Sequence, residues 1–174
     1  MKNSPPFENG KRYYPLSQHY LEHFGEKVYK VSVSVAESCP NRESHKAMTV
    51  CIFCDEWGSA AYHQIRDLPI LKKIQINRES IRKRYKAEKF LIYFQSYTNT
   101  FGHIKDLETL YCKALKEKDV VGLVIGTRPD CLPKMILKKF AKLSQEQYLS
   151  VELGAQTFDD YQLRFLSRGH DSAT

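Results

Sequence analysis

Four short segments rich in apolar residues predict β-strands. Lys27–Val35 alternates apolar and polar residues, as a half-buried strand does. Lys89–Gln95 is apolar nearly throughout, which is typical of a strand buried in a parallel sheet, and Val120–Gly126 and Tyr148–Leu153 are the other two candidates. The pattern therefore predicts a sheet whose strands lie far apart in the sequence.

Apolar residues recur at helical spacing before the first predicted strand and in the segments between the strands. The predicted helices are Arg12–Phe24, which ends at Gly25, and then Leu68–Lys86, Lys105–Lys118 and Pro133–Gln147. Strands that alternate with helices form right-handed βαβ units and a parallel sheet. The expected fold class is therefore α/β.

Three of the five cysteines lie in a polar segment, Ser38–Gly58, that follows the first predicted strand. Cys39, Cys51 and Cys54 have the spacing C-x11-C-x2-C. Loops at the carboxyl ends of strands bind the cofactors and substrates of α/β proteins. Because core packing alone does not hold such a loop, a bound metal or cluster is a natural reason for its thiols.

A polar tract follows each predicted strand, in the order CPNRES, SYTNT, TRPD and GAQT. The carboxyl ends of parallel strands lie at the same edge of a sheet. We therefore expect the four tracts to meet beside the cysteines and to form a site there.

The composition fits a folded protein with one hydrophobic core. The chain has 174 residues, of which 42% are hydrophobic and 12% aromatic. No apolar run approaches the roughly 20 residues that span a bilayer, and the N-terminus lacks the apolar stretch of a signal peptide. We expect a cytoplasmic protein without a membrane partner. Its thiols would then be reduced, so that they serve as ligands or core residues rather than as disulfides.

The net charge of +7 and the pI of about 9.1 favour an anionic partner such as RNA. Much of this charge lies in the basic helical segment Leu68–Lys86. Taken alone, such a segment is more often a solvated helix face than a surface that binds RNA, and basic soluble proteins are common.

The ligand count leaves two kinds of metal site open. A C-x2-C pair is a common half of a zinc site, but a closed zinc site needs four ligands, so that His45 or His63 would have to supply the fourth. Iron–sulfur clusters usually take four thiolates, and three thiolates would leave one iron of a 4Fe–4S cluster open to a small molecule. Cys112 and Cys131 are interpreted as ordinary residues.

Further stretches repeat the motifs of one family in consistent order along nearly the whole chain. They are KRYY (Lys11–Tyr14), FGEKVYK (Phe24–Lys30), CPNR (Cys39–Arg42), CIFC (Cys51–Cys54), YFQSYTNT (Tyr93–Thr100), VVGLVIGTRPDCLP (Val120–Pro133), VELGAQT (Val151–Thr157) and RGHD (Arg168–Asp171). On these stretches the chain resembles the radical S-adenosylmethionine (SAM) superfamily, in its YhcC-like branch, whose members are related to the Elongator catalytic subunit. Relatives usually carry glycines between the first two cysteines, whereas this loop has none.

The resemblance implies a TIM-like (β/α) barrel of the radical SAM type. A complete barrel of this kind has about 250 residues, whereas this chain has 174, so that it resembles only the N-terminal part, truncated after the fourth strand. The expected organisation is a lead and helix in residues 1–26 and a radical SAM core in residues 27–174. A partial barrel exposes a strand edge and apolar surface, so that we expect marginal stability and self-association.

The resemblance implies a radical SAM enzyme, or a fragment of one. A 4Fe–4S cluster on Cys39, Cys51 and Cys54 would cleave SAM to methionine and a 5′-deoxyadenosyl radical, with electrons from a donor of the flavodoxin or ferredoxin type. The kinship with Elongator and the positive charge indicate RNA as the substrate class, with the wobble uridine of tRNA as one target. Two alternatives stay open, namely a non-catalytic zinc-binding module that interacts with RNA, and an inert truncated fragment.

The resemblance also implies a set of SAM contacts. Phe53 would pack near the adenine, and the tract after the second strand would contact the SAM amino group through Ser96, Tyr97, Thr98 and Asn99. The later strand ends would contact SAM or the substrate through Thr127, Arg128, Asp130, Glu152, Gln156, Arg164 and Arg168. Within this set, the glutamate and the glutamine would bind the ribose hydroxyls. One of the last two arginines would pair with the methionine carboxylate, which suits a guanidinium geometrically.

Overall fold

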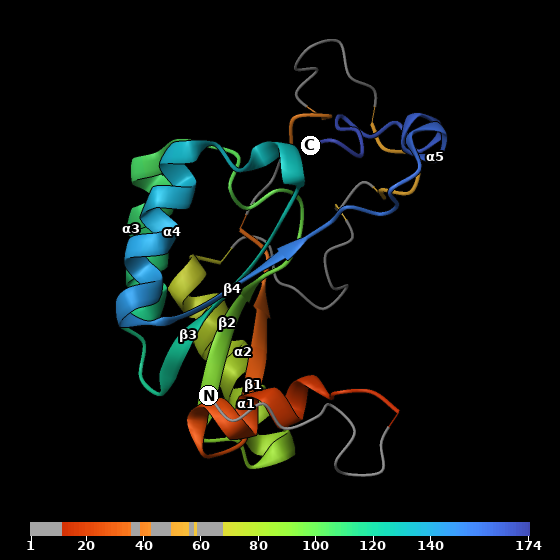
Figure 1. The fold of residues 1–174 in the computed structure, drawn as a ribbon. Helices are drawn as coiled ribbons and strands as arrows, with labels where there is room; N and C mark the ends of the chain where they lie inside the picture. The colour runs from red at the N-terminus through yellow and green to blue at the C-terminus, as the bar shows by residue number, and fades with distance from the viewer. Residues whose placement is uncertain (1–11, 36–38, 43–49, 56–57, 59–67) are drawn as a thin grey trace.

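The computed structural model describes residues 12–35, 39–42, 50–55, 58 and 68–174. Its framework is one sheet of four parallel strands in the order β1-β2-β3-β4 (Figure 1). The strands are β1 (Val28–Val33), β2 (Lys89–Phe94), β3 (Val120–Thr127) and β4 (Tyr148–Leu153). The predicted α/β class, the four strands and their parallel pairing are thereby confirmed.

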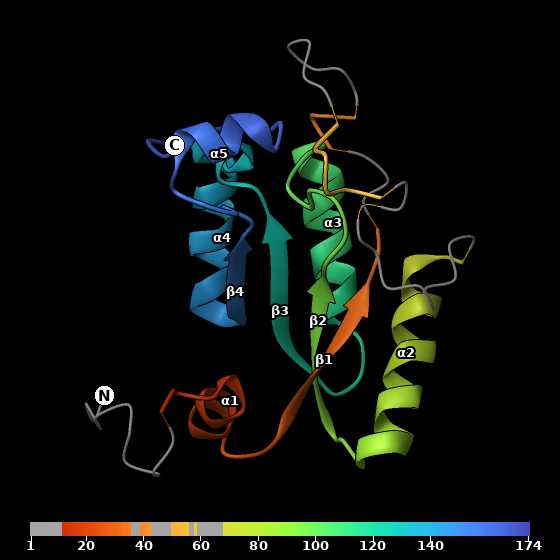
Figure 2. The ribbon, with the colours of Figure 1, turned by 90° about the vertical axis from the view of Figure 1, so that its right-hand side faces the viewer.

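Three helices cover one face of this sheet (Figure 2). They are α2 (Ile70–Tyr85), α3 (Ile104–Leu115) and α4 (Lys134–Glu146). Because side chains alternate along a strand, every second residue of the strands points to this face and is buried against the helices. The strand residues of this core are Val31, Val33, Phe90, Ile92, Phe94, Leu123 and Ile125. Within the described ranges, every helix is too short or too polar to be a membrane-spanning segment.

The first helix, α1 (Leu16–Phe24), covers the amino end of the opposite face of the sheet. Tyr20 of this helix packs in a second core with Leu91, Val124 and Tyr148. The hydroxyl of Tyr148 also lies 3.1 Å from Nε2 of His19. The carboxyl end of the same face leads to the cavity described below.

The start of the first helix differs from the prediction because of a proline. The predicted helix Arg12–Phe24 begins only at Leu16, because the residue before Pro15 is restricted from the helical region. It ends at Gly25, which has a φ of 75°, as the pattern predicts.

In the described part of the chain, two short helices lie outside the predicted elements. The 3-10 helix η2 (Pro129–Cys131) follows β3, and α5 (Asp160–Phe165) follows β4. The carboxylate of Asp159 caps α5, since it accepts hydrogen bonds from the backbone N–H groups of Tyr161 (2.8 Å) and Gln162 (3.1 Å).

Candidate functional site

A cavity of about 360 Å³ lies at the carboxyl end of the sheet. All four polar tracts that follow the strands contribute to its lining, together with the cysteines. The predicted site residues that line it are Cys39, Cys51, Phe53, Cys54, Tyr97, Thr98, Thr127, Arg128, Glu152, Gln156 and Arg168. Segments distant in the sequence are therefore brought together around one space, as the topology of a parallel sheet requires.

Four of the predicted residues do not line this cavity. Asp130 binds the guanidinium of Arg128. Ser96 is buried, and its hydroxyl is hydrogen-bonded to that of Ser34. The side-chain amide of Asn99 donates to the carbonyl oxygens of Phe94 (3.0 Å), Ser96 (3.1 Å) and Gly126 (2.9 Å), so that it ties the ends of β2 and β3 together. Arg164 is exposed on α5.

The three cysteines of the C-x11-C-x2-C segment are free thiols that border the cavity. A turn closed by the N–H of Cys54 and the carbonyl of Cys51, 3.0 Å apart, places these two residues beside each other. Burial raises the pKa of the Cys54 thiol, and the nearby Cys51 and Cys39 raise it further. A bound metal cation would lower the pKa of these thiols, because metal ligation favours the thiolate.

The arrangement of the thiols bears on the kind of metal group that fits. Among the residues that the structure describes, no three His, Cys, Asp or Glu side chains are grouped so as to hold one metal ion. The thiolates of a 4Fe–4S cluster need not converge on one ion, because each binds a separate iron. This finding therefore bears on a site for a single ion among the described residues and not on a cluster. His45 and His63, the proposed fourth zinc ligands, lie outside the described residues.

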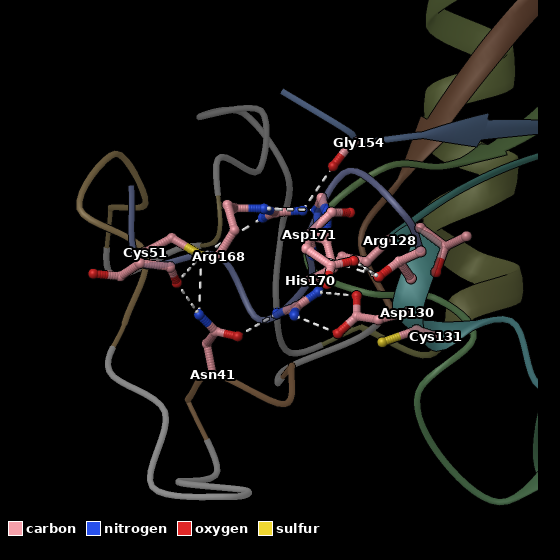
Figure 3. Close-up of polar contacts among 12 residues, drawn as sticks. Asn41, Cys51, Arg128, Asp130, Cys131, Gly154, Arg168, His170 and Asp171 are labelled. Atoms are coloured by element: carbon pink, nitrogen blue, oxygen red, sulfur yellow. Dashed lines mark hydrogen bonds and ion pairs between the residues drawn. The ribbon is translucent and has the colours of Figure 1, made fainter. Parts of the chain in front are cut away.

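A chain of hydrogen bonds joins the end of β3 to Cys51 (Figure 3). Arg128, only 4% exposed, donates to both carboxylate oxygens of Asp130, over 2.9 and 2.6 Å. Its remaining terminal nitrogen donates to Oδ1 of Asn41, and Nδ2 of Asn41 donates to Sγ of Cys51 over 3.2 Å. Arg128 thus lines the cavity while its guanidinium is bound by Asp130 and Asn41.

Arg168 approaches the same sulfur from the segment that follows α5. Its Nη1 lies 3.6 Å from Sγ of Cys51, and its Nη2 donates to the carbonyl of Gly154 over 2.7 Å (Figure 3). The guanidinium carbon is also 5.7 Å from the centroid of the Phe53 ring, which suits a cation–π contact. Arg168 therefore connects the cysteine segment with the end of β4.

The far end of the cysteine segment is held by the tract after β2. Gly58 lies against the ring of Tyr97, and the backbone N–H of Tyr97 donates to the carbonyl of Gly58 over 3.4 Å. The guanidinium of Arg42 lies 5.2 Å from the centroid of the same ring. Tyr97 is thereby a docking point for the segment as well as part of the cavity wall.

Glu152 forms an ion pair on the open face of the sheet. Its carboxylate pairs with the ammonium of Lys30, which in turn lies 4.5 Å from the centroid of the Tyr93 ring. Burial raises the pKa of Glu152, but hydrogen bonds from Lys30 and Tyr93 outweigh this effect and lower the pKa below its usual value. The carboxylate is therefore ionised at neutral pH, and Lys30 is its partner.

The sequence patterns missed several residues of this site. Asn41 and Arg42 belong to the CPNR stretch, and Lys30 to FGEKVYK, but neither stretch shows which side chain meets which partner. The remaining cysteines behave as ordinary residues in the structure. Cys112 is exposed on α3, and Cys131 is buried, which raises the pKa of its thiol to about 12.

Comparison with known proteins gives relatives at moderate identity. The chain is 37% identical over 173 residues to the uncharacterized protein YtqA of Bacillus subtilis, a match that covers 98% of this chain and 54% of YtqA. It is 36% identical over 152 residues to protein YhcC of Escherichia coli, covering 86% of this chain and 48% of YhcC. It is also 36% identical over 150 residues to the uncharacterized protein MJ0486 of Methanocaldococcus jannaschii, a match that covers 85% of this chain and 45% of MJ0486.

The chain therefore spans about half the length of the curated relatives that it matches. No protein-family model matches it. The names of these relatives state no activity, so that the function is argued from the cavity itself.

Proposed function

We propose that this chain is the cluster- and SAM-binding part of a radical SAM enzyme. The observation that carries the proposal is that three thiols, spaced C-x11-C-x2-C, border one cavity together with all four strand-end tracts. The relatives of similar sequence are about twice as long, so that the activity of the whole protein is part of the proposal.

Cys39, Cys51 and Cys54 would hold a 4Fe–4S cluster. When bound, the cluster and SAM supply the reductive cleavage of SAM to methionine and a 5′-deoxyadenosyl radical, which abstracts hydrogen from a substrate. The protein supplies the thiolates, the orientation of the bound groups and a space that limits access of water.

The polar lining of the cavity suits the proposed cosubstrate. The guanidinium of Arg42 and that of Arg168 place positive charge at a wall of the cavity, which favours a ligand carboxylate. Glu152 and Gln156 border the end of β4 and present an acceptor and an amide, which suit ribose hydroxyls. Phe53, 43% exposed, offers an aromatic surface for an adenine ring.

RNA remains the proposed substrate class, and its support is the net charge of +7. The exposed basic residues Lys83, Arg84 and Lys86 lie at the carboxyl-terminal end of α2, which points away from the cysteine segment (Figure 2). An RNA bound at the cavity would therefore have to use other basic residues, including Arg42. A flavodoxin or ferredoxin is the proposed electron donor.

Anaerobic reconstitution with iron and sulfide tests this proposal directly. The reconstituted chain is reduced with dithionite in the presence of SAM, and 5′-deoxyadenosine is measured by chromatography. We expect a brown protein that forms 5′-deoxyadenosine, and the loss of both properties in Cys51→Ala. Cys112→Ala is the matched control, since Cys112 is an exposed thiol on α3, and it should behave as the unchanged chain does.

Other outcomes separate the alternatives. A colourless protein that retains zinc after purification and takes up no iron would contradict the proposal and favour a zinc-binding module. A cluster without SAM cleavage would restrict the chain to cluster binding. In that case, the half of the relatives that this chain does not match would be needed for the SAM pocket.

A further inference from the structure

The sulfur of Cys51 has polar contacts with three other residues. Nδ2 of Asn41 lies 3.2 Å from it, Nη1 of Arg168 lies 3.6 Å from it, and the carbonyl oxygen of Ser167 lies 3.7 Å from it. The first two are N–H donors and the third is an acceptor for a thiol proton. Two donors, one of them cationic, favour electron density on this sulfur.

The orientation of the Asn41 amide is fixed by the residues behind it. A guanidinium has donors and no acceptor, so that the group facing Arg128 has to be the amide oxygen of Asn41. The amide nitrogen then faces Cys51, and its two hydrogens are directed at Sγ of Cys51 and at the carbonyl of Ser167, 2.7 Å away. Asn41 is only 2% exposed, so that water does not compete for these bonds.

Arg128 is fixed in turn by Asp130, through the paired contacts of 2.9 and 2.6 Å. Although burial favours the neutral form, the hydrogen bond and the charge of Asp130 raise the pKa of Arg128, so that the guanidinium stays charged. A chain of contacts therefore runs from Asp130 at the end of β3 through Arg128 and Asn41, and it holds the Asn41 amide against Cys51 (Figure 3).

We infer that Asn41 and Arg168 are positioning residues that form an N–H donor site for the metal-bound sulfur of Cys51. On the proposed function, on which this inference rests, the donor site raises the reduction potential of the cluster. A one-electron reduction adds negative charge that is shared by the iron-bound sulfurs, and hydrogen bonds to these sulfurs stabilise the reduced form more than the oxidised form. In the described part of the chain, Cys51 is the one of the three cysteines whose sulfur accepts hydrogen bonds from side chains.

Two variants weaken the donor site by different changes. Asn41→Asp keeps an oxygen for Arg128 and replaces the nitrogen that faces Cys51 by an acceptor. Arg168→Gln removes the charge and shortens the donor, whereas Arg168→Lys keeps the charge and an N–H donor. The matched controls are Asn77→Asp on α2 and Arg164→Gln on α5, which make the same chemical changes away from Cys51.

The test is the midpoint potential of the reconstituted cluster, followed by electron paramagnetic resonance. We expect a more negative potential in Asn41→Asp and in Arg168→Gln, partial recovery in Arg168→Lys, and unchanged potentials in both controls. Circular dichroism checks that each variant is folded, and the two donor variants are independent, so that the failure of one to fold leaves the other as the test. Equal potentials in all variants would overturn the inference and leave the proposed function intact.

A second probe separates the inference from the proposed function. Co²⁺ is bound by the apoprotein, and its thiolate-to-cobalt charge-transfer absorption is recorded. If no iron–sulfur cluster forms but cobalt binds, the proposed function fails. The donor site at Cys51 is then supported by a shifted absorption in Asn41→Asp and Arg168→Gln, and overturned by an unchanged one. A chain that binds neither cluster nor cobalt overturns both.

Discussion

Gly58 lies against the ring of Tyr97 so closely that a Cβ at Gly58 would be 2.5 Å from Cδ1 of that ring. Gly58 also has a φ of 62°, which disfavours other residues. We predict that Gly58→Ala lowers the free energy of unfolding by about 1–3 kcal/mol, since the ring has to move and the backbone is strained. Urea unfolding measures this loss.

Gly25→Ala is the control for that experiment. Gly25 has a φ of 75°, and no atom lies within 4 Å of the position that a Cβ would take there, so that it shares the backbone strain but not the ring contact. The loss in Gly58→Ala should therefore exceed the loss in Gly25→Ala. Equal losses would show that the contact with Tyr97 contributes nothing to stability.

Asn99 should be a major determinant of stability at the edge of the cavity. Its amide bridges three backbone carbonyls at the ends of β2 and β3, and the residue is 2% exposed. Asn99→Ala removes the side-chain donor from these buried acceptors, of which only the carbonyl of Gly126 keeps a bond from the backbone N–H of residue 99, so that we expect a loss of about 3 kcal/mol in the free energy of unfolding. Asn77→Ala is the control, because it removes one half-buried hydrogen bond of 2.9 Å to the carbonyl of Ser32 and should cost about 1 kcal/mol. If it costs as much as Asn99→Ala, the bridging role of Asn99 is contradicted.

The ion pair between Lys30 and Glu152 should make stability depend on pH. The pKa of Glu152 in the folded protein is lower than its usual value of 4.5, so that the pair stabilises the fold above this pH and loses its effect as the pH falls through the lowered pKa. We predict that Lys30→Met costs about 0.5–1 kcal/mol at pH 7, a value limited by the 41% exposure of the Glu152 side chain. The cost should disappear in acid.

Urea unfolding at neutral and acidic pH measures this effect. Lys139→Met is the matched control, since Lys139 forms an exposed pair with Glu108 over 2.5 Å, with both side chains nearly half exposed. This control should change stability little at either pH. A cost of Lys30→Met that persists in acid would point to lost packing of the lysine stem on Tyr93 instead of lost charge pairing.

The thiols should differ sharply in reactivity. Burial raises the pKa of Cys131 to about 12, so that its thiol is neutral at mildly alkaline pH, whereas Cys112 is exposed on α3. We predict that iodoacetamide alkylates Cys112 in the folded apoprotein and reaches Cys131 only after unfolding. Mass spectrometry of peptides, sampled over time, measures both rates, and comparable rates in the folded protein would show that Cys131 is accessible.

The strands were predictable because their signal is local. Val120–Thr127 and Lys89–Phe94 are apolar because the helices and α1 bury both faces of these strands, and this requirement appears directly as a run of apolar residues. The meeting of the polar tracts was also predictable, since it follows from parallel topology alone. The short α5 was not, because its six residues show too little periodicity and its start depends on the cap at Asp159.

The pairing of polar side chains was not predictable, because it joins segments that the sequence pattern treats separately. Ser96 and Asn99 belong to the tract that follows β2 at the carboxyl end of the sheet, where the cavity lies. The turn after β2 nevertheless directs both side chains into the protein. Arg128 belongs to a tract that faces the cavity, yet Asp130 two positions later binds its guanidinium. Such outcomes depend on backbone turns and on partners elsewhere in the fold, which periodicity does not contain.

The contact of Cys51 with Arg168 joins residues that are 117 positions apart, and its support through Arg128 comes from a third distant segment. A ribosome therefore releases all three cysteines long before the side chains that surround Cys51 have been made. The surroundings of Cys51 are complete only after the segment that follows β4 has been synthesised and has folded against the cysteine segment. The proposed donor site at Cys51 therefore depends on the folding of this last segment.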